Sequence, residues 1–370
     1  MKIRMCRIIA FLALAWALAF SGIGYAQERG WATAIDWSPD GETIAVGSST
    51  GVWFFDTEFN ETGYVATPEM KGFSPTTMDW SAKGDLLAIA VARAPNVIGA
   101  PILIIDFNRL EVISQIDEGS LTTVLRWHPQ ENLIMAGMES RILIWDAITG
   151  KVEQVLSDKV LSDRSLRNYA TSVCWLDANT IAAIGSYDIY IIDVETEATL
   201  NKLEIWDLEN VDCYQDRKLV SRKGVVDLKS GELVISNVET TTFADYQRDV
   251  VDVAWSPDGR RFVVHGNISL CRFGVYDAQT AKLLAELQGS FSRLHDVLVY
   301  QDTISWQPTG DLIAAVGQFD IRLWEARSYK LLHRYDRFEV GDHQLIDPDE
   351  HLSDDERRLE MYSNYTKCPD

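Results

Sequence analysis

An aromatic residue followed by a turn recurs seven times along this chain of 370 residues. Two copies continue with Ser-Pro-Asp-Gly, at residues 38–41 and 256–259. Proline presets the first central position of a β-turn and glycine accepts a positive φ, so these segments connect the strands of hairpins. The copies occupy residues 31–336, about 44 residues each, and their aromatic residues are Trp37, Trp80, Trp127, Trp175, Tyr214, Trp255 and Trp306.

A second marker follows each turn in the same order. An apolar strand rich in small residues comes first, and a later strand ends in an apolar residue followed by an acid. Strands this short, at this density of turns, indicate an all-β ring or sandwich. A period of about 40–45 residues is typical of a four-stranded propeller blade. The seven apolar–acidic pairs are Phe55-Asp56, Ile105-Asp106, Trp145-Asp146, Ile192-Asp193, Val226-Asp227, Tyr276-Asp277 and Trp324-Glu325.

The two markers predict an all-β fold, a seven-bladed β-propeller with four antiparallel strands in each blade. One such sheet is apolar on both faces, and radial stacking lets neighbouring blades cover each other. We expect the repeated tryptophan to fill the gap between adjacent blades. The fifth copy is the least regular, because Tyr214 replaces tryptophan and the Pro-Gly turn is missing. Blades are expected near residues 31–70, 71–117, 118–157, 168–204, 205–240, 248–289 and 300–337 of a propeller domain spanning 27–337.

The repeat resembles the WD-repeat family over nearly all of residues 31–336, through Trp-Ser-Pro-Asp-Gly and Trp145-Asp146. The resemblance implies a non-catalytic scaffold that binds a protein partner. The family's Gly-His pair before the first strand is essentially absent, although Asp188 and Asp320 occupy its acidic turn position. Residues 188–193 (Asp-Ile-Tyr-Ile-Ile-Asp) also resemble the repeats of Tol-type periplasmic propellers, which usually have six blades. Seven copies favour the first family.

The first 26 residues have the layout of a secretory signal peptide. Basic residues precede an apolar run from residue 8 to residue 20, and small residues then lead to Ala26 as the cleavage site. The run is shorter than the roughly 20 residues of a bilayer span. We therefore expect an exported protein, periplasmic or extracellular, with no stable membrane span after cleavage. An uncleaved membrane anchor is the alternative.

The chain is strongly acidic, with a formal net charge of -21. Such a surface repels phosphate backbones, which argues against a nucleic-acid partner. Residues 338–370 form an acidic C-terminal tail, in which Ser353 and Glu356 match a capping box that opens a short helix.

Ring closure is expected to need no exchanged strand, and the ring is expected to be monomeric. Cleavage leaves only residues 27–30 before the first predicted strand, whereas residues 330–336 supply a fourth strand to the last repeat. Blades seven and one should then be joined by packing alone.

Four cysteines remain beyond the N-terminal segment. A chain of this length buries its own core without disulfides. Cys174 and Cys213 each precede an aromatic residue in an apolar stretch, so we expect both to be buried free thiols. Whether Cys271 and Cys368 pair is left open by the sequence.

No catalytic motif is present, and we expect no catalytic residue, no cofactor and no metal site. The six histidines are scattered, and the sequence contains no nucleophile elbow, phosphate-binding loop or paired metal motif. The alternative is a propeller hydrolase or lyase, or a glycan-binding protein, with a site in the central channel that no local motif marks. A deep pocket in which at least three acidic, His or Arg groups converge would favour it.

The candidate partner-binding face carries the turns between second and third strands and the loops between blades. Aromatic residues and arginines dominate binding hot spots. The candidate residues on this face are Tyr187, Phe319, Met138, Arg141, Arg222, Lys223, Arg164, Arg167 and Tyr169.

Overall fold

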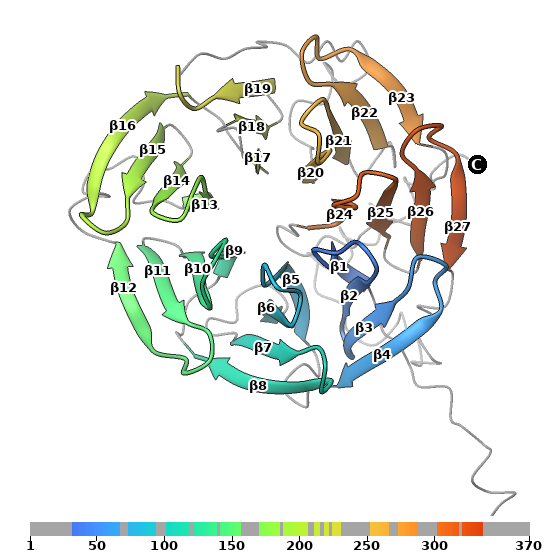
Figure 1. Cartoon of the computed structure of the whole chain (residues 1–370), viewed down its shortest axis with the longest axis horizontal. Coiled ribbons are helices and arrows are strands. Elements are labelled where there is room, and N and C mark those ends of the chain that lie inside the picture. Colours follow the sequence, from blue (N-terminus) through green and yellow to red (C-terminus); the bar gives the residue numbers. More distant parts are fainter. Residues whose placement is uncertain are drawn as a thin grey trace, which may run out of the picture.

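The computed structural model consists of seven antiparallel sheets arranged as a ring (Figure 1). It describes residues 32–66, 73–93, 101–117, 122–138, 141–156, 170–185, 188–205, 211–214, 218–221, 224–230, 252–265, 273–287, 302–317 and 320–335. The predicted signal peptide, the predicted tail helix, Cys271 and Cys368 lie outside these residues.

The first four blades each have four strands in chain order. Blade 1 contains β1 (Ala32–Trp37), β2 (Ile44–Ser48), β3 (Gly51–Phe55) and β4 (Glu61–Ala66). Blade 2 contains β5 (Phe73–Trp80), β6 (Leu86–Arg93), β7 (Ile102–Asp106) and β8 (Glu111–Ile116). Blade 3 contains β9 (Thr122–Trp127), β10 (Leu133–Met138), β11 (Arg141–Asp146) and β12 (Val152–Leu156). Blade 4 contains β13 (Ala170–Trp175), β14 (Thr180–Gly185), β15 (Asp188–Asp193) and β16 (Ala198–Glu204).

The remaining blades follow the same order. Blade 5 has three strands among the described residues: β17 (Asp212–Tyr214), β18 (Lys218–Ser221) and β19 (Gly224–Asp227). Blade 6 contains β20 (Asp252–Trp255), β21 (Arg261–His265), β22 (Phe273–Asp277) and β23 (Leu283–Leu287). Blade 7 contains β24 (Ile304–Trp306), β25 (Leu312–Val316), β26 (Ile321–Glu325) and β27 (Leu331–Tyr335). The predicted seven-bladed propeller is confirmed.

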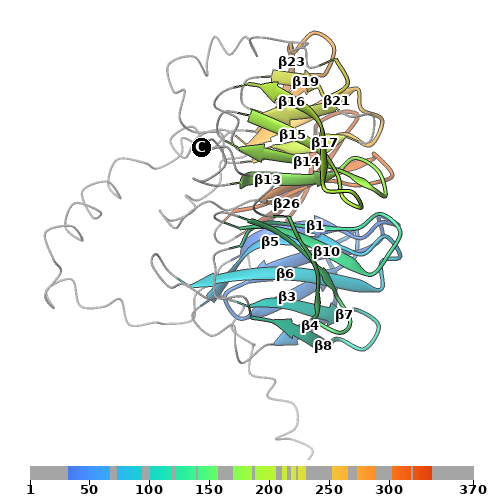
Figure 2. The same ribbon diagram turned by 90° about the vertical axis from the view of Figure 1, so that its left-hand side faces the viewer.

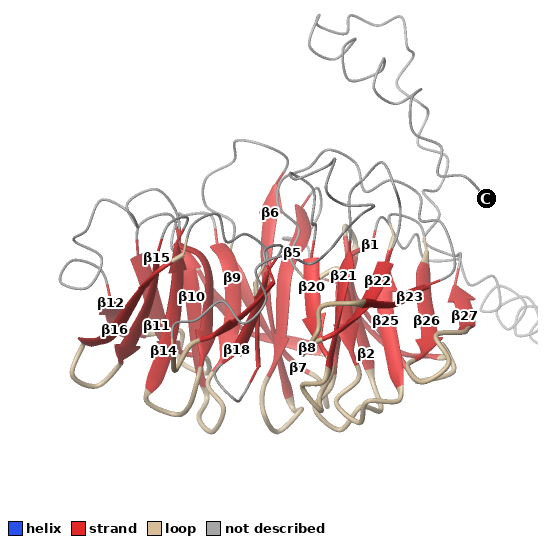
Figure 3. Ribbon diagram, turned by 90° about the horizontal axis from the view of Figure 1, so that it is seen from above, coloured by secondary structure: helices blue, strands red, loops and turns tan. Residues whose placement is uncertain are grey.

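The first strand of every blade lines the axis of the ring, and the fourth strands form the rim (Figure 1). Seen edge-on, the described strands lie within one disc (Figure 2). The described turns between first and second strands and between third and fourth strands share one face (Figure 3). The described part of the chain contains no helix long and apolar enough to cross a membrane.

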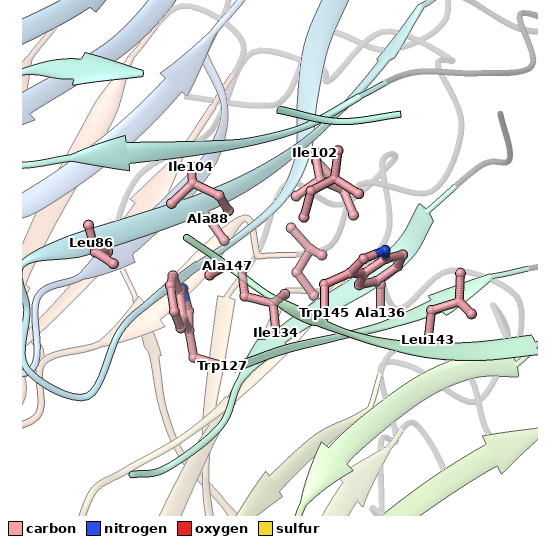
Figure 4. Close-up of a cluster of buried hydrophobic side chains, with 13 residues drawn as sticks. Leu86, Ala88, Ile102, Ile104, Trp127, Ile134, Ala136, Leu143, Trp145 and Ala147 are labelled. Atoms are coloured by element: carbon pink, nitrogen blue, oxygen red, sulfur yellow. The ribbon is translucent and has the colours of Figure 1, made fainter. Parts of the chain in front are cut away.

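The hydrophobic core is divided among the seven gaps between blades. Each of seven clusters of buried side chains joins one pair of neighbouring blades. Between blades 2 and 3, Trp127 and Trp145 pack against Leu86, Ala88 and Ile104 (Figure 4). Burying one tryptophan removes about 150–250 Å² from water, which contributes roughly 4–6 kcal/mol. The prediction that the repeated tryptophan fills these gaps is correct for six interfaces.

Strand register corrects the aromatic position of blade 5. In the other blades the repeated tryptophan pairs with a second-strand residue that is in turn paired with the apolar residue before the acid of the third strand, as Trp127 pairs with Ile134 and Ile134 with Trp145. In blade 5, Cys213 pairs with Leu219, and Leu219 pairs in turn with Val226. Tyr214 lies opposite Lys218 instead. The prediction of Tyr214 at the repeated position is therefore wrong by one residue.

The acid after each third strand holds the following turn. The side chain of Asp146 accepts hydrogen bonds from Thr149 N at 2.7 Å and from Ile148 N at 3.1 Å. The bond from Thr149 lowers the pKa of Asp146. Asp56 and Asp277 hold their turns in the same way. This local role explains why the acid recurs in every copy.

The acidic turn positions of blades 4 and 7 are satisfied by cations. Asp188 pairs with Lys202 at 3.3 Å. Asp320 pairs with Arg322 at 2.8 Å and with Arg334 at 3.1 Å, and both Asp320 and Arg322 are buried. Ion pairs with lysine and arginine thus satisfy both acidic turn positions.

The last blade carries its own fourth strand, β27, as predicted. Blades 7 and 1 are not joined by packing alone, however, and that expectation is wrong. Ile35 N donates to Asp302 O at 2.7 Å, and Gln307 Nε2 donates to Gly41 O at 2.7 Å. Phe55 and Tyr335 also pack edge to face, with ring centroids 5.1 Å apart. Hydrogen bonds of backbone and side-chain groups in and beside the two inner strands thus add to the packing at this closure.

The gap-filling role of tryptophan gives a direct test on stability. Trp127→Ala leaves a cavity between blades 2 and 3, and we expect it to lower the free energy of unfolding by about 3–5 kcal/mol. Leu200→Ala, on the exposed rim strand β16, is the matched control and should change it by less than about 0.5 kcal/mol. Urea denaturation followed by tryptophan fluorescence and circular dichroism measures both. Equal effects of the two substitutions would contradict the assignment.

Candidate functional site

A polar cavity of about 170 Å³ lies at the centre of the ring, among the inner strands. Its charged groups come from six of the seven blades' inner strands or the residues just before them. Apolar residues such as Met78 and Val253 complete the wall. The charged residues are five aspartates and one arginine: Asp36, Asp79, Arg126, Asp212, Asp252 and Asp302.

Four of these charged residues share one position in the repeat. Asp36, Asp79, Arg126 and Asp212 each come directly before the repeated position of the inner strand. Successive side chains of a strand point to opposite sides. When the repeated side chain enters the gap to the preceding blade, its predecessor therefore lies on the side that faces the next blade, and the four charged predecessors also line the cavity.

The aspartates at this position also hold the next blade. Asp79 accepts the backbone N–H of Trp127 on its carboxylate and the Trp127 indole N–H on its carbonyl, the latter at 2.7 Å. Asp212 binds Trp255 in the same way, at 2.9 Å and 3.1 Å. The two pairs repeat one device, which connects blade 2 to blade 3 and blade 5 to blade 6.

Asp302 connects four blades. It lies just before β24 of blade 7, and its carbonyl accepts Ile35 N of blade 1. Its carboxylate accepts Met78 N of blade 2 at 3.0 Å and lies 3.5 Å from Arg126 Nη2 of blade 3. The backbone φ of Asp302 is +65°, a conformation that few residues other than glycine adopt. The contacts to three other blades hold this residue in place.

Asp252 anchors the start of blade 7 from blade 6. Its buried carboxylate accepts Val253 N at 2.8 Å, Ile304 N at 3.0 Å and Thr303 N. The Thr303 hydroxyl lies 2.9 Å from His265 Nδ1. Burial lowers the pKa of His265 to about 3, so this imidazole is neutral at physiological pH.

Burial in the channel raises the pKa of its carboxyl groups. It raises the pKa of Asp252 to about 8, with a further contribution from the charge of Asp302. It raises the pKa of Asp79 to about 7, against the opposing effect of Arg126. The pKa values of Asp36 and Asp212 are raised as well. Carboxyl groups that exchange protons near pH 7–8 are suited to general acid–base chemistry.

Two of the nine residues predicted to bind a partner belong to described strands. Met138 and Arg141 are paired in register at the β10–β11 turn, and neither lines the cavity. The other seven candidates, Tyr187, Phe319, Arg222, Lys223, Arg164, Arg167 and Tyr169, lie outside the described residues. Among the residues that the structure describes, no group of three or more His, Cys, Asp or Glu side chains is placed to hold a metal ion.

Sequence reasoning missed the channel cluster. A signal for it was present, because an acid or arginine directly precedes the repeated residue in four copies. Asp212 was hidden by the wrong register of blade 5. Asp252 begins its inner strand and Asp302 precedes its own, and the two share no motif. The expectation of two buried free thiols is also wrong, since Cys174 and Cys213 form a disulfide.

Comparison with known sequences gives short matches. No family model matches the chain. Protein cortex of Heliconius erato is 28% identical over 136 residues, which cover 32% of this chain and 27% of that protein. Meiotic fizzy-related protein 1 of Schizosaccharomyces pombe is 29% identical over 146 residues, which cover 37% and 30%. The chain thus spans less than a third of the length of these relatives.

Comparison with solved structures shows the fold. The β-propeller domain of Cps50 (Swd1) from Myceliophteria thermophila has a TM-score of 0.63 at 15% identity, covering 80% of this chain and 97% of that one. The C-terminal WD40 domain of Sif2 has a TM-score of 0.54 at 16% identity, covering 79% and 95%. Hydrazine synthase of Kuenenia stuttgartiensis has a TM-score of 0.58 at 14% identity, covering 83% and 98%. The chain has a seven-bladed β-propeller fold, which these structures share in overall form.

The raised pKa of Asp252 predicts how stability depends on pH. Folding retains a proton that the unfolded carboxyl, with a pKa near 3.8, releases. This stabilisation is complete below the unfolded pKa and is lost as the pH rises through about 8. Between pH 5 and pH 8 the carboxyl should therefore lower the free energy of unfolding by up to about 1.4 kcal/mol per pH unit.

We expect Asp252→Asn to flatten this decline in urea denaturation at pH 5, 6.5 and 8. Asp193→Asn is the control, because Asp193 lies in an exposed turn and its pKa is lowered by the hydrogen bonds of Thr196. Its substitution should leave the slope between pH 5 and pH 8 unchanged. A slope that is the same in all three proteins would contradict the role of Asp252.

Proposed function

We propose that this propeller is an exported, non-catalytic scaffold that binds a protein partner on one face of the disc. The observation that carries the proposal is the ring itself, which is a WD40-type propeller. The buried apolar side chains of its sheets pack between neighbouring blades. The inner and outer strands form a rigid frame, and the connections at the two faces are free to vary without loss of the core.

The two faces differ in their connections. On one face, short turns hold themselves by hydrogen bonds, as where Gly41 N donates to Ser38 O and Gly259 N donates to Ser256 O. The opposite face carries the connections between blades, of which the β12–β13 connection has 13 residues and the β23–β24 connection 16. Arg164, Arg167 and Tyr169 belong to the first of these. Longer connections with arginine and aromatic residues support this face as the binding surface.

Two observations support export. The N-terminal 26 residues have the pattern of a signal peptide. The disulfide between Cys174 and Cys213 is the kind of bond that persists in periplasmic or extracellular compartments and is rare in the cytosol.

Affinity capture from the exported fraction tests the scaffold. We expect the wild-type chain to recover a stoichiometric protein partner, and Tyr187→Ala with Phe319→Ala to lose it. The matched control is Ile148→Ala with Arg327→Ala, two exposed residues of turns on the opposite face, and it should retain the partner. If the control loses the partner and the first variant retains it, the partner binds the opposite face and the proposed face is wrong. Recovery of no stoichiometric partner would overturn the scaffold.

We infer a ligand or catalytic site in the channel as the second candidate function. The observation that favours it is the convergence of Asp36, Asp79, Asp212, Asp252 and Asp302 around Arg126 in one cavity. Carboxyl groups that keep a proton near neutral pH, such as Asp79, are suited to general acid–base hydrolysis or to hydrogen bonds with sugar hydroxyls. The competing explanation is structural, because the same carboxylates hold the inner strands together.

Turnover assays on p-nitrophenyl glycosides and esters separate these explanations. An enzyme should hydrolyse at least one of them with a pH profile that titrates near pH 7, and Asp79→Asn should reduce the rate at least 100-fold while circular dichroism stays unchanged. Asp193→Asn is the control and should keep full activity. Absence of turnover, or equal rates in Asp79→Asn and wild type, would leave the carboxylates with a structural role only.

A further inference from the structure

The boundary between blades 4 and 5 departs from the pattern of the ring. At the other six boundaries the tryptophan of the following blade belongs to the core between the two sheets. At this boundary the equivalent position is Cys213, whose side chain is far smaller. Substituting a small side chain at such a position removes apolar contact that the neighbouring sheet requires.

Cys174 occupies the position of the repeat that Asp79 occupies in blade 2 and Asp212 in blade 5. It directly precedes Trp175, as Asp79 precedes Trp80. Asp79 reaches across to Trp127, the repeated residue of the next blade, by a hydrogen bond. Cys174 reaches across to the repeated residue of its own next blade by a disulfide, with Cα atoms 6.2 Å apart. The disulfide is thus the covalent counterpart of the aspartate–tryptophan contact.

Besides the disulfide, we find one side-chain hydrogen bond between the described residues of these two inner strands and their ends. Ser172 Oγ donates to Val211 O at 3.4 Å, a long hydrogen bond. The remaining contacts are apolar, among residues such as Ile189, Leu203 and Leu219. The described strands of blade 5 have only three or four residues each. The disulfide thus adds a covalent link to a boundary that is otherwise held by apolar packing and one long hydrogen bond, beside a blade whose described strands are short.

We propose that the disulfide is a redox latch that fixes blade 5 to blade 4, and that its reduction loosens the ring at this boundary. The reductant is an external dithiol. One of its thiolates attacks Cys213 Sγ, which is half-buried, whereas Cys174 is buried, and the Sγ–Sγ bond breaks. The second thiolate then releases Cys213, the dithiol becomes a disulfide, and both cysteines end as thiols. This device goes beyond the proposed scaffold function and does not require a partner.

The latch makes a prediction for the full chain purified without reductant, with Cys6, Cys271 and Cys368 replaced by serine. Dithiothreitol should speed amide hydrogen exchange in β17–β19 at least 10-fold, leave β10 and β11 unchanged, and lower the Tm by about 5 °C. Cys174→Ala with Cys213→Ala should show the fast exchange from the outset and no response to dithiothreitol.

A matched variant restores the noncovalent device of the other blades. Cys174→Asp with Cys213→Trp recreates the aspartate–tryptophan pair, and we expect slow exchange in blade 5 that dithiothreitol does not change. The latch is overturned if the purified, denatured chain titrates with two free thiols. It is equally overturned if the disulfide is present and its reduction leaves exchange in β17–β19 unaltered, and this outcome is independent of whether a partner is found.

Discussion

The structure depends on the burial of two apolar faces per sheet. The second and third strands of a blade are short and apolar and have no polar side to turn toward water, as the fully buried β2, β3 and β14 show. A ring is a solution in which every such face meets another one, and seven separate core clusters are the result. The repeated tryptophans fill six of the seven gaps. Blade geometry therefore follows from packing between blades more than from pairing within them.

The polar channel is a consequence of the same arrangement. Where the repeated side chain enters one gap, its predecessor lies on the side of the next blade at the inner strand, and the charged predecessors contribute to the channel wall. In this chain that position is acidic in three blades and basic in one. The carboxylates serve the ring by accepting N–H groups of the next blade, as Asp79 and Asp212 do. Burial also raises their pKa values, so a structural device and a proton-exchanging site coincide.

Blade 5 shows how a repeat tolerates a defective copy. Its inner strand lacks the tryptophan, and a covalent bond to blade 4 stands where packing and hydrogen bonds act elsewhere. On its other side it keeps the standard contact, because Asp212 holds Trp255. Asp302 and Asp252 play a comparable part at the closure, where they tie blade 7 to blades 6, 1 and 2. The ring is thus held at its irregular points by individual side chains.

The amino-acid sequence was sufficient for the number of blades, the strand order and the role of the tryptophans, because these follow from short-range periodicity repeated seven times. It failed at Tyr214, since one turn without Pro-Gly removes the marker that sets the register. It also failed for the Cys174–Cys213 bond, for the contacts of Asp302 with Thr77 and Met78, and for the gathering of five aspartates around Arg126. Those residues are far apart in the chain and carry no common spacing. Only closure of the ring, which depends on the summed angles of all seven interfaces, brings them within contact distance.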